Sequence, residues 1–215
     1  METKEQALKR GSGLLRNRGR MVSVKDYLEE ILNFSDCIDK VKCITGTTIT
    51  GKMEPGAICF VLLLKDFRTG NNSFKTISEG IKKKLLEQSE LTISSKDFHL
   101  VEPIFVELSV NVWVYTAAVD QGFEIQTRLQ ESLEVFFHPL TTETSEGWEI
   151  GSIPDKSRIG MQLMREKGEA MIGKLVVTAV YYDQSGRHEV DLEELEVTPF
   201  MVCCSGTHTI HVTYQ

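Results

Sequence analysis

The segment from Leu100 to Thr116 constrains the fold most, because apolar and polar side chains alternate along it. One set of alternate positions is wholly aliphatic and consists of Val106, Leu108, Val110, Val112 and Val114. The positions between them hold Glu107, Ser109, Asn111, Trp113 and Tyr115. Successive side chains of a strand point to opposite faces of a sheet, so this period of two predicts a long strand with one buried and one more polar face. Pro103 suits the start of that strand or an edge position.

Helical spacing of apolar residues appears on both sides of this strand. Ser23 and Asp26 have the spacing of a capping box, and apolar residues then recur at helical intervals until about Phe34. The other predicted elements are strands at 41–45, 57–64, 174–182 and 207–214, and helices at 74–85, 123–138 and 156–167. The apolar strand at 57–64 is expected in the middle of a sheet.

Helices interleaved with few strands favour an α+β fold, made of two small sheets that each carry helices on one face. We expect a basic arm or linker at residues 1–22, a first α+β module at 23–98 and a second at 99–215. No internal repeat and no low-complexity segment is evident.

Composition places the chain among ordinary globular proteins, since 41% of its 215 residues are hydrophobic and 26% are charged. The longest apolar runs, 59–64 and 110–114, are far shorter than the roughly 20 residues that span a bilayer. The first residues are polar and charged, unlike a signal peptide. Five cysteines without framework spacing suit a reducing compartment. The sequence therefore predicts synthesis in the cytoplasm, free thiols and no membrane partner.

Charge is distributed unevenly along the chain. Residues 1–25 carry seven Lys and Arg against two Glu, a net charge of +5. Because the whole chain has a net charge of −7, residues 26–215 together carry −12. Arg16, Arg18 and Arg20 share one face if their segment is extended. An acidic body repels nucleic-acid phosphates, so we expect no nucleic-acid partner. The basic arm is either a solvated terminus or, as we prefer, a segment that docks on an acidic neighbouring protein.

Residues that could carry chemistry do not converge in the sequence. A phosphate-binding glycine loop, a nucleophile elbow and a zinc-protease helix motif are all lacking. His208 and His211 lie three apart in a predicted strand and face opposite sides, which disfavours a shared metal. Cys203 and Cys204 are expected as buried thiols without redox function. We therefore predict no catalytic residues, no cofactor and no metal site, and a protein that is not an enzyme.

Trp113 and Tyr115 are the aromatic residues on the polar face of the long predicted strand. Such rings can stack on a ligand, and equally can bury against another protein or a helix. We favour a protein contact and name both as partner-binding candidates, together with Arg16, Arg18 and Arg20. The alternative is a small-molecule-binding or regulatory α+β module, whose pocket this face would line.

Three segments in a fixed order carry a family resemblance. The first is GLLRNRGRMVSVKDY at 13–27, continuing to IDKVKC at 38–43. The second is PGAICFVLL at 55–63. The third is VEPIFVELSV at 101–110, followed by a predicted helix, Phe137-His-Pro-Leu140 and Gly147-Trp148.

This ordered set resembles the baseplate J-like proteins of contractile phage tails and related injection systems, in particular their C-terminal portion. The resemblance implies a structural wedge subunit, six-fold arranged, that assembles with other wedge subunits, the central spike or hub, and sheath-proximal proteins. It also implies synthesis in the bacterial cytoplasm and incorporation into a phage tail or injection particle. Family members are usually longer, and where they often continue Pro-Phe-Gly this chain has Glu149-Ile150-Gly151.

Overall fold

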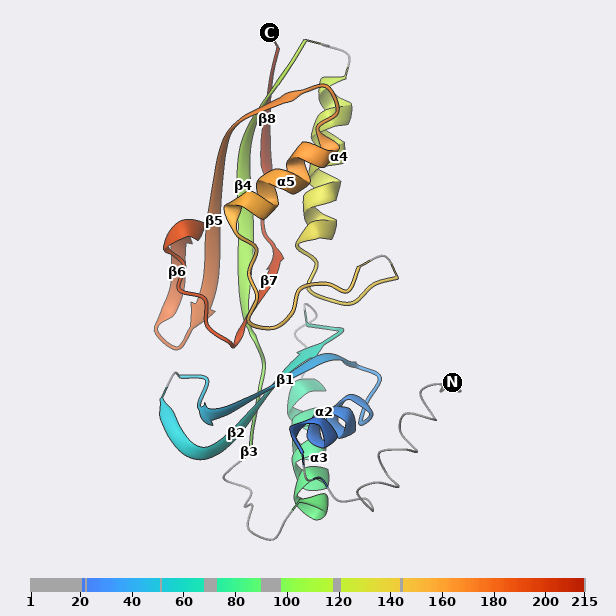
Figure 1. The fold of residues 1–215 in the computed structure, drawn as a ribbon, viewed down its shortest axis with the longest axis vertical. Coiled ribbons are helices and arrows are strands. Elements are labelled where there is room, and N and C mark those ends of the chain that lie inside the picture. The colour runs from blue at the N-terminus through green and yellow to red at the C-terminus, as the bar shows by residue number, and fades with distance from the viewer. Residues whose placement is uncertain are drawn as a thin grey trace. The chain divides into compact units, whose positions relative to one another are not determined.

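The computed structural model divides the chain into two compact units, with the boundary in sequence between Glu102 and Pro103 (Figure 1). The described residues are 21, 23–50, 52–67, 73–89, 98–117, 121–143 and 145–214. Each unit combines helices with one mixed sheet, so the fold is α+β, as the sequence predicts.

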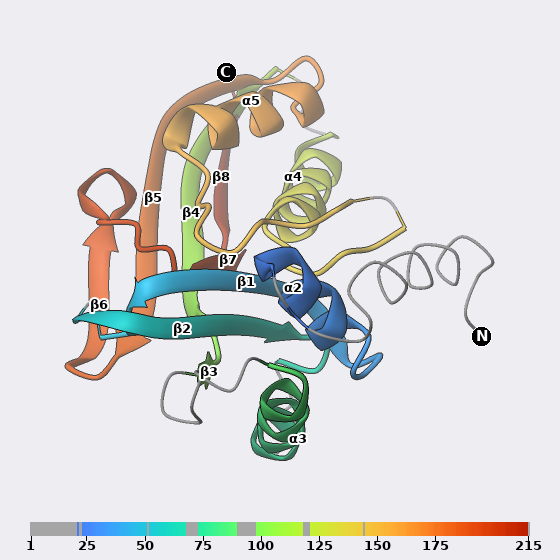
Figure 2. The same cartoon turned by 60° about the horizontal axis from the view of Figure 1, so that its bottom comes forward.

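Unit 1 contains a three-stranded sheet in the order β1-β2-β3 (Figure 2). β1 is antiparallel to β2, and β3 is parallel to β2. The elements are α2 (Val24–Leu32), β1 (Ile38–Thr47), β2 (Met53–Leu64), α3 (Ser73–Gln88) and β3 (Phe98–Val101). The capping box predicted for α2 is present, because Ser23 Oγ accepts from Asp26 N while Asp26 Oδ2 accepts from Ser23 N.

The core of unit 1 is built on the central strand β2. Tyr27 of α2, Phe60 of β2 and Phe98 of β3 form an aromatic cluster with ring centroids 5.8 to 6.1 Å apart. All four residues of Phe60–Leu63 are 0% exposed, so both faces of this strand are buried. The sequence prediction of a central strand at 57–64 is confirmed.

Unit 2 contains a five-stranded sheet in the order β6-β5-β4-β7, with β8 also paired to β4 (Figure 1). Its elements are β4 (Ile104–Thr116), α4 (Gly122–Phe136), α5 (Lys156–Glu166), β5 (Met171–Asp183), β6 (Gly186–Asp191), a short 3-10 helix (Leu192–Glu194), β7 (Met201–Ser205) and β8 (Thr209–Tyr214). β4 is antiparallel to β5 and parallel to β7 and β8.

β4 therefore has two short partner strands on one side, and the junction between them needs other hydrogen bonds. β7 pairs with residues 104–108 and β8 with residues 111–116. Between them, Thr207 N donates to Ser109 Oγ at 3.1 Å, and Val110 N donates to His208 Nδ1 at 3.2 Å. The side chains of Ser109 and His208 thus accept from backbone N–H groups at the junction, where no strand pairs with β4.

The predicted alternation along β4 is confirmed by burial. The aliphatic positions from Val106 to Val114 are at most 1% exposed and pack in one cluster with residues of α4 and α5. The inward residues of these helices are Ile125, Leu129 and Leu133 of α4, and Ile159 and Leu163 of α5. One face of the sheet is thus covered by two helices.

The predicted single strand at 100–116 is wrong at its start, where the structure has two strands in different sheets. β3 pairs with β2 in unit 1, whereas β4 begins at Ile104, whose N donates to Phe200 O at 2.9 Å. Pro103, which has no N–H to donate, lies between them. The second module was predicted to begin at residue 99, whereas residues 99–101 belong to β3 and pair with β2 of unit 1.

β7 was not predicted as a strand. Met201, Val202, Cys203 and Cys204 are all buried, so this five-residue strand shows no alternation. The prediction that both adjacent cysteines are buried thiols is confirmed.

Candidate interaction surface

The side of the unit 2 sheet opposite α4 and α5 is formed by the polar set of β4 positions and their neighbours. Paired residues of adjacent strands place their side chains on the same face. Asn111 pairs with Thr209, Trp113 with His211, and Tyr115 with Thr213. The side chains of Trp113 and Tyr115 are only partly buried. The structure thus places both predicted partner-binding aromatics on one face, as their spacing indicated.

Trp113 is held in a stack with residues from two other strands. The His211 ring of β8 lies 4.7 Å from the Trp113 ring, centroid to centroid, at an interplanar angle of 18°. Lys174 Nζ of β5 lies 5.5 Å from the Trp113 centroid, within the range of a cation–π interaction. These contacts orient the indole, so a partner would meet a largely preformed aromatic surface.

Tyr115 is positioned by a glycine. A Cβ added at Gly173 would lie 2.5 Å from Tyr115 Cε2, so the ring occupies the space that a side chain there would fill. Met171, which pairs with Tyr115, is 68% exposed. The surface formed by Trp113, Tyr115, Met171, Lys174 and His211 is called the aromatic surface below.

The partner-binding residues predicted from the sequence do not include Lys174, Met171 or His211. The alternation at 207–214 predicts on which face of its own strand His211 lies. That His211 lies beside Trp113 follows only when the pairing of β8 with β4 is known. The pairing of β4 with β5 also has a register irregularity between Val112 and Val114, and no pattern in the sequence predicts this shift. Arg16, Arg18 and Arg20 lie outside the described residues.

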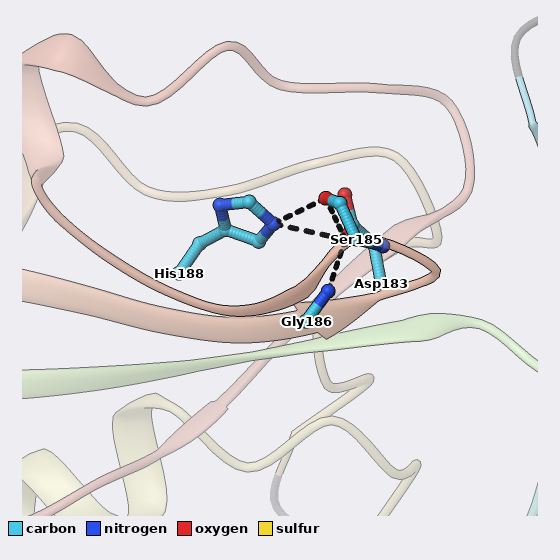
Figure 3. A network of polar contacts seen from close by, with 4 residues as sticks. All are labelled: Asp183, Ser185, Gly186 and His188. Carbon is cyan, nitrogen blue, oxygen red and sulfur yellow. Dashed lines mark hydrogen bonds and ion pairs between the residues drawn. The ribbon is translucent and has the colours of Figure 1, made fainter.

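Asp183, Ser185 and His188 form a polar cluster with the residue types of a catalytic triad (Figure 3). His188 Nε2 lies 2.9 Å from Asp183 Oδ1 and 2.8 Å from Ser185 Oγ. In a working triad one ring nitrogen faces the nucleophile while the other faces the carboxylate. Here a single nitrogen faces both, and Ser185 Oγ donates to Asp183 at 2.6 Å.

This cluster instead closes the hairpin between β5 and β6. Asp183 Oδ1 also accepts from Ser185 N at 2.7 Å and from Gly186 N at 3.2 Å, as in an Asx turn. The hydrogen bond from the Ser185 side chain, followed by that from His188, lowers the pKa of Asp183 to about 2. The carboxylate is therefore charged at neutral pH and stabilises the turn.

Three of the described cysteines are not activated as nucleophiles. Burial raises the pKa of Cys59 to about 11, with the neighbouring Cys43 adding to the shift. Burial also raises the pKa of Cys43, and that of Cys203 well above its ordinary value. A nucleophilic or metal-binding cysteine acts as the thiolate, and these three stay protonated at neutral pH.

His208 is a satisfied structural histidine. Its Nδ1 accepts from Val110 N, its Nε2 lies 2.9 Å from Ser205 Oγ, and its ring centroid lies 5.4 Å from that of Phe137. Burial lowers its pKa, opposed by the charge of Glu134, so the neutral ring is favoured in the folded state. Among the described residues, no group of three or more His, Cys, Asp or Glu is arranged to hold a metal ion.

Hollows bordered by described residues include two on unit 2. The larger has a volume of about 520 Å³ and is lined by Glu131, Glu134, Val135, His138 and Thr142. The smaller, about 160 Å³, lies beside the start of α5. None of the helices in the described ranges has both the length and the apolar character required to cross a membrane.

Comparison with known proteins finds similarity in structure only. No protein-family model and no curated protein sequence matches the chain. A chain in the cryo-EM structure of the anti-feeding prophage baseplate, six-fold symmetrised, matches with a TM-score of 0.57 and 13% sequence identity. The two chains share a fold. The match covers 98% of this chain and 42% of that chain, so this protein spans less than half the length of its structural relative.

Proposed function

We propose that the protein is a structural subunit of the baseplate of a contractile phage tail or a phage-like contractile injection system. It acts by assembling with other proteins and not by catalysis. The observation that carries the proposal is the fold shared with a baseplate chain across 98% of the present chain. The ordered motifs at 13–43, 55–63 and 101–148 support it independently, because they resemble baseplate J-like proteins in sequence alone.

Within the baseplate we assign the chain to the wedge, as the sequence resemblance implies. Its partners are then other wedge subunits, the central spike or hub, and sheath-proximal proteins. The aromatic surface around Trp113 and Tyr115 is the proposed contact in unit 2, and the basic arm with Arg16, Arg18 and Arg20 is a second contact, to an acidic neighbour. Many modest contacts of this kind can rearrange together when a tail contracts.

The assignment is tested in the particle. Particles are purified from cells that produce the protein with a small affinity tag, and their composition is determined by mass spectrometry and cryo-EM. We expect the protein to copurify with sheath and spike proteins and to occupy density in the baseplate. A protein found only as a free monomer, with particles that lack it, would contradict the assignment.

The aromatic surface is tested by replacing Trp113 and Tyr115 together with Ala. We expect incorporation into particles to fall at least about tenfold, because truncation of an aromatic anchor commonly costs 2 kcal/mol or more of binding. Tyr182→Ala is the matched control, since it removes a tyrosine 63% exposed at the opposite end of β5. Equal incorporation of both variants would reject the aromatic surface as a contact.

The basic arm is tested by replacing Arg16, Arg18 and Arg20 with Ala. We expect weaker assembly, more so at low salt because surface charges attract over longer distances there, with the melting temperature of the isolated chain unchanged. Unchanged assembly would reject the arm as a docking segment and leave the aromatic surface untouched.

A further inference from the structure

Strand β8 forms part of one edge of the unit 2 sheet (Figure 1). In the described part of the chain, β4 is its only strand partner, and no hydrogen bond joins its backbone to a loop or a side chain. An edge strand presents a row of N–H and C=O groups with which a further strand can pair. β8 therefore offers a backbone template for another extended segment.

The other sheet edges among the described strands carry features that discourage such pairing. β1 has register irregularities near both ends and three charged residues, and β6 has three charged residues among its six. β3 is only four residues long. The edge at β7 is approached by a loop, whose Gly151 N donates to Met201 O at 2.5 Å. Charges, irregularities, shortness and coverage all keep sheet edges from associating.

β8 lacks these protective features. Its sequence, TIHVTY at 209–214, contains no proline, no glycine and no Lys, Arg, Asp or Glu. All of its residues except the histidine are β-branched or aromatic, which suits a strand with neighbours on both sides. Its pairing with β4 is regular throughout, from Asn111 to Thr116. A regular and uncharged edge of this kind favours association with another strand.

The side chains of β8 are also complementary to those of a second copy. Ile210, Val212 and Tyr214 lie on the core side of the sheet, because their β4 partners are buried. In an antiparallel pair of β8 strands centred on Val212, this residue lies opposite its own copy and Ile210 lies opposite Tyr214. Opposite residues share a face, so each apolar side chain meets an apolar one. Tyr214, 50% exposed in the single chain, is covered in the pair.

The open-face side chains are compatible with the same register. His211 lies opposite Thr213 of the second copy, so no like charges oppose each other. A pair centred on His211 instead would set two imidazoles against each other and would leave Tyr214 beyond the paired residues. The pairing centred on Val212 is therefore the favoured one.

Helix α4 runs alongside β8 on the core side of the sheet (Figure 1). Its first turn is at Tyr214, since a Cβ added at Gly122 would collide with Tyr214 Oη. Its end is near His208, whose ring centroid lies 5.4 Å from that of Phe137. Val212 is therefore level with the second turn of α4, near Gln126.

The flank of α4 that faces away from α5 leaves room for a symmetric neighbour. Arg128 and Ser132 hydrogen-bond to α5, and with 3.6 residues per turn Gln126 and Gln130 lie on the opposite flank. Two copies therefore bring uncharged amide side chains together at the two-fold axis. Glu134, on the same flank, is about 12 Å further along the helix, so the two copies of this carboxylate lie on opposite sides of the axis.

We propose that β8 is a self-association edge, at which the β8 strands of two copies pair antiparallel about a two-fold axis at Val212. The two sheets then form one continuous sheet, with the helices of both copies on one face and both aromatic surfaces on the other. The contact is isologous, since both copies use the same strand. Backbone hydrogen bonds give affinity, and the apolar pairs set the register. The occupant is a second copy because β8 itself supplies an apolar residue opposite each of its own.

The proposal does not depend on the baseplate assignment, since it concerns the purified full chain. Sedimentation velocity over a concentration series measures association of the wild type, for which we expect a dimer. Tyr214→Lys places an ammonium group opposite Ile210 of the second copy, so we expect the dissociation constant to rise at least about tenfold. Tyr182→Lys is the matched control, because it makes the same change at a tyrosine 63% exposed at the end of β5, and it should leave association unchanged.

A cysteine cross-link tests the register directly. Opposite residues of antiparallel strands have Cα atoms about 4.5–5.5 Å apart, within the range of a disulfide. We therefore expect Val212→Cys, made together with Cys37→Ser to remove an exposed native thiol, to form a covalent dimer on mild oxidation. His211→Cys in the same background is the control, since its own copy lies diagonally across at about 7–8 Å. It should stay unlinked.

Melting temperatures establish that each variant remains folded, and the cross-link gives a readout that does not depend on Tyr214→Lys. A wild-type chain that stays monomeric at about 100 μM would overturn the proposal. Association of Tyr214→Lys as tight as that of the wild type would overturn it equally. So would a covalent dimer through residue 211 and not through residue 212, or no covalent dimer through either.

Discussion

The central strands of the two units, β2 and β4, are buried in different ways. In β2 the residues Phe60–Leu63 are 0% exposed on both faces of the strand. In β4 only the aliphatic face is buried, while Glu107 is exposed and Trp113 and Tyr115 are partly so. The sequences already differ accordingly, since β2 is a continuous apolar run and β4 alternates. β2 is therefore buried on both faces, whereas β4 builds the core of unit 2 with one face and leaves the other face, which carries the proposed contact, partly open.

The largest expected effects test the claim that both faces of β2 are buried. Leu62→Ala and Leu63→Ala alter adjacent residues that point to opposite faces. Because each side chain is 0% exposed, each truncation leaves a cavity and should lower the free energy of unfolding by about 2–5 kcal/mol. Hydrogen exchange of amides in β1 and β2 measures this. If Leu63→Ala lowered the free energy of unfolding only slightly while Leu62→Ala lowered it strongly, only one face of β2 would contribute to stability.

The same pair of neighbours in β4 should behave unequally. Leu108→Ala removes a side chain that is 0% exposed and should cost about 2–5 kcal/mol of unfolding free energy. Glu107→Ala, one residue away on the other face, should change stability by at most about 0.5 kcal/mol. Urea denaturation followed by tryptophan fluorescence reports on unit 2, because Trp113 and Trp148 both lie there. Comparable losses for the two variants would remove the distinction between the strands.

Much of this comparison was accessible from the sequence, because periodicity reports burial directly. The alternation of 106–115 gave the buried and open faces of β4, and the helical stripe of α4 gave Ile125, Leu129 and Leu133. The capping box at Ser23 gave the start of α2. These features depend on residues close together in the chain, and local patterns encode them.

Features that depend on distant residues were not accessible. The break at Pro103 separates two strands because β3 pairs with β2 some 40 residues earlier, and the prediction of one continuous strand across 100–116 missed it. β7 escaped prediction because both of its faces are buried and it lacks a period. The stack of Trp113 on His211 joins residues 98 positions apart, so it follows from strand order and not from spacing.

A smaller effect tests how β4 tolerates two short partners. Val110 is 1% exposed, and its N–H donates to His208 Nδ1 at the junction between the two short partners of β4. Loss of this acceptor should cost about 1–3 kcal/mol. His208→Asn, which retains an acceptor near the Nδ1 position, should lose less stability than His208→Ala.

The pH dependence of this contact has a definite sign. Burial lowers the pKa of His208, so the unfolded chain binds the proton more readily than the folded one. Its contribution to stability is fully present above the unfolded pKa of about 6.5 and declines as pH falls from there towards the folded pKa. His208→Asn should flatten the stability profile in that window. A profile that keeps the wild-type slope would assign the pH dependence to another group.

The smallest effects concern the open face of β4, where the comparison predicts little stability to lose. Lys174→Gln removes the cation over the Trp113 ring, and His211→Ala removes the stacked imidazole. Partly exposed contacts of this kind contribute about 0.5–1 kcal/mol each. A double-mutant cycle by urea denaturation measures whether the two losses are coupled through the shared indole. If either change cost as much as Leu108→Ala, the open face would belong to the core of unit 2, and the contrast with β2 would disappear.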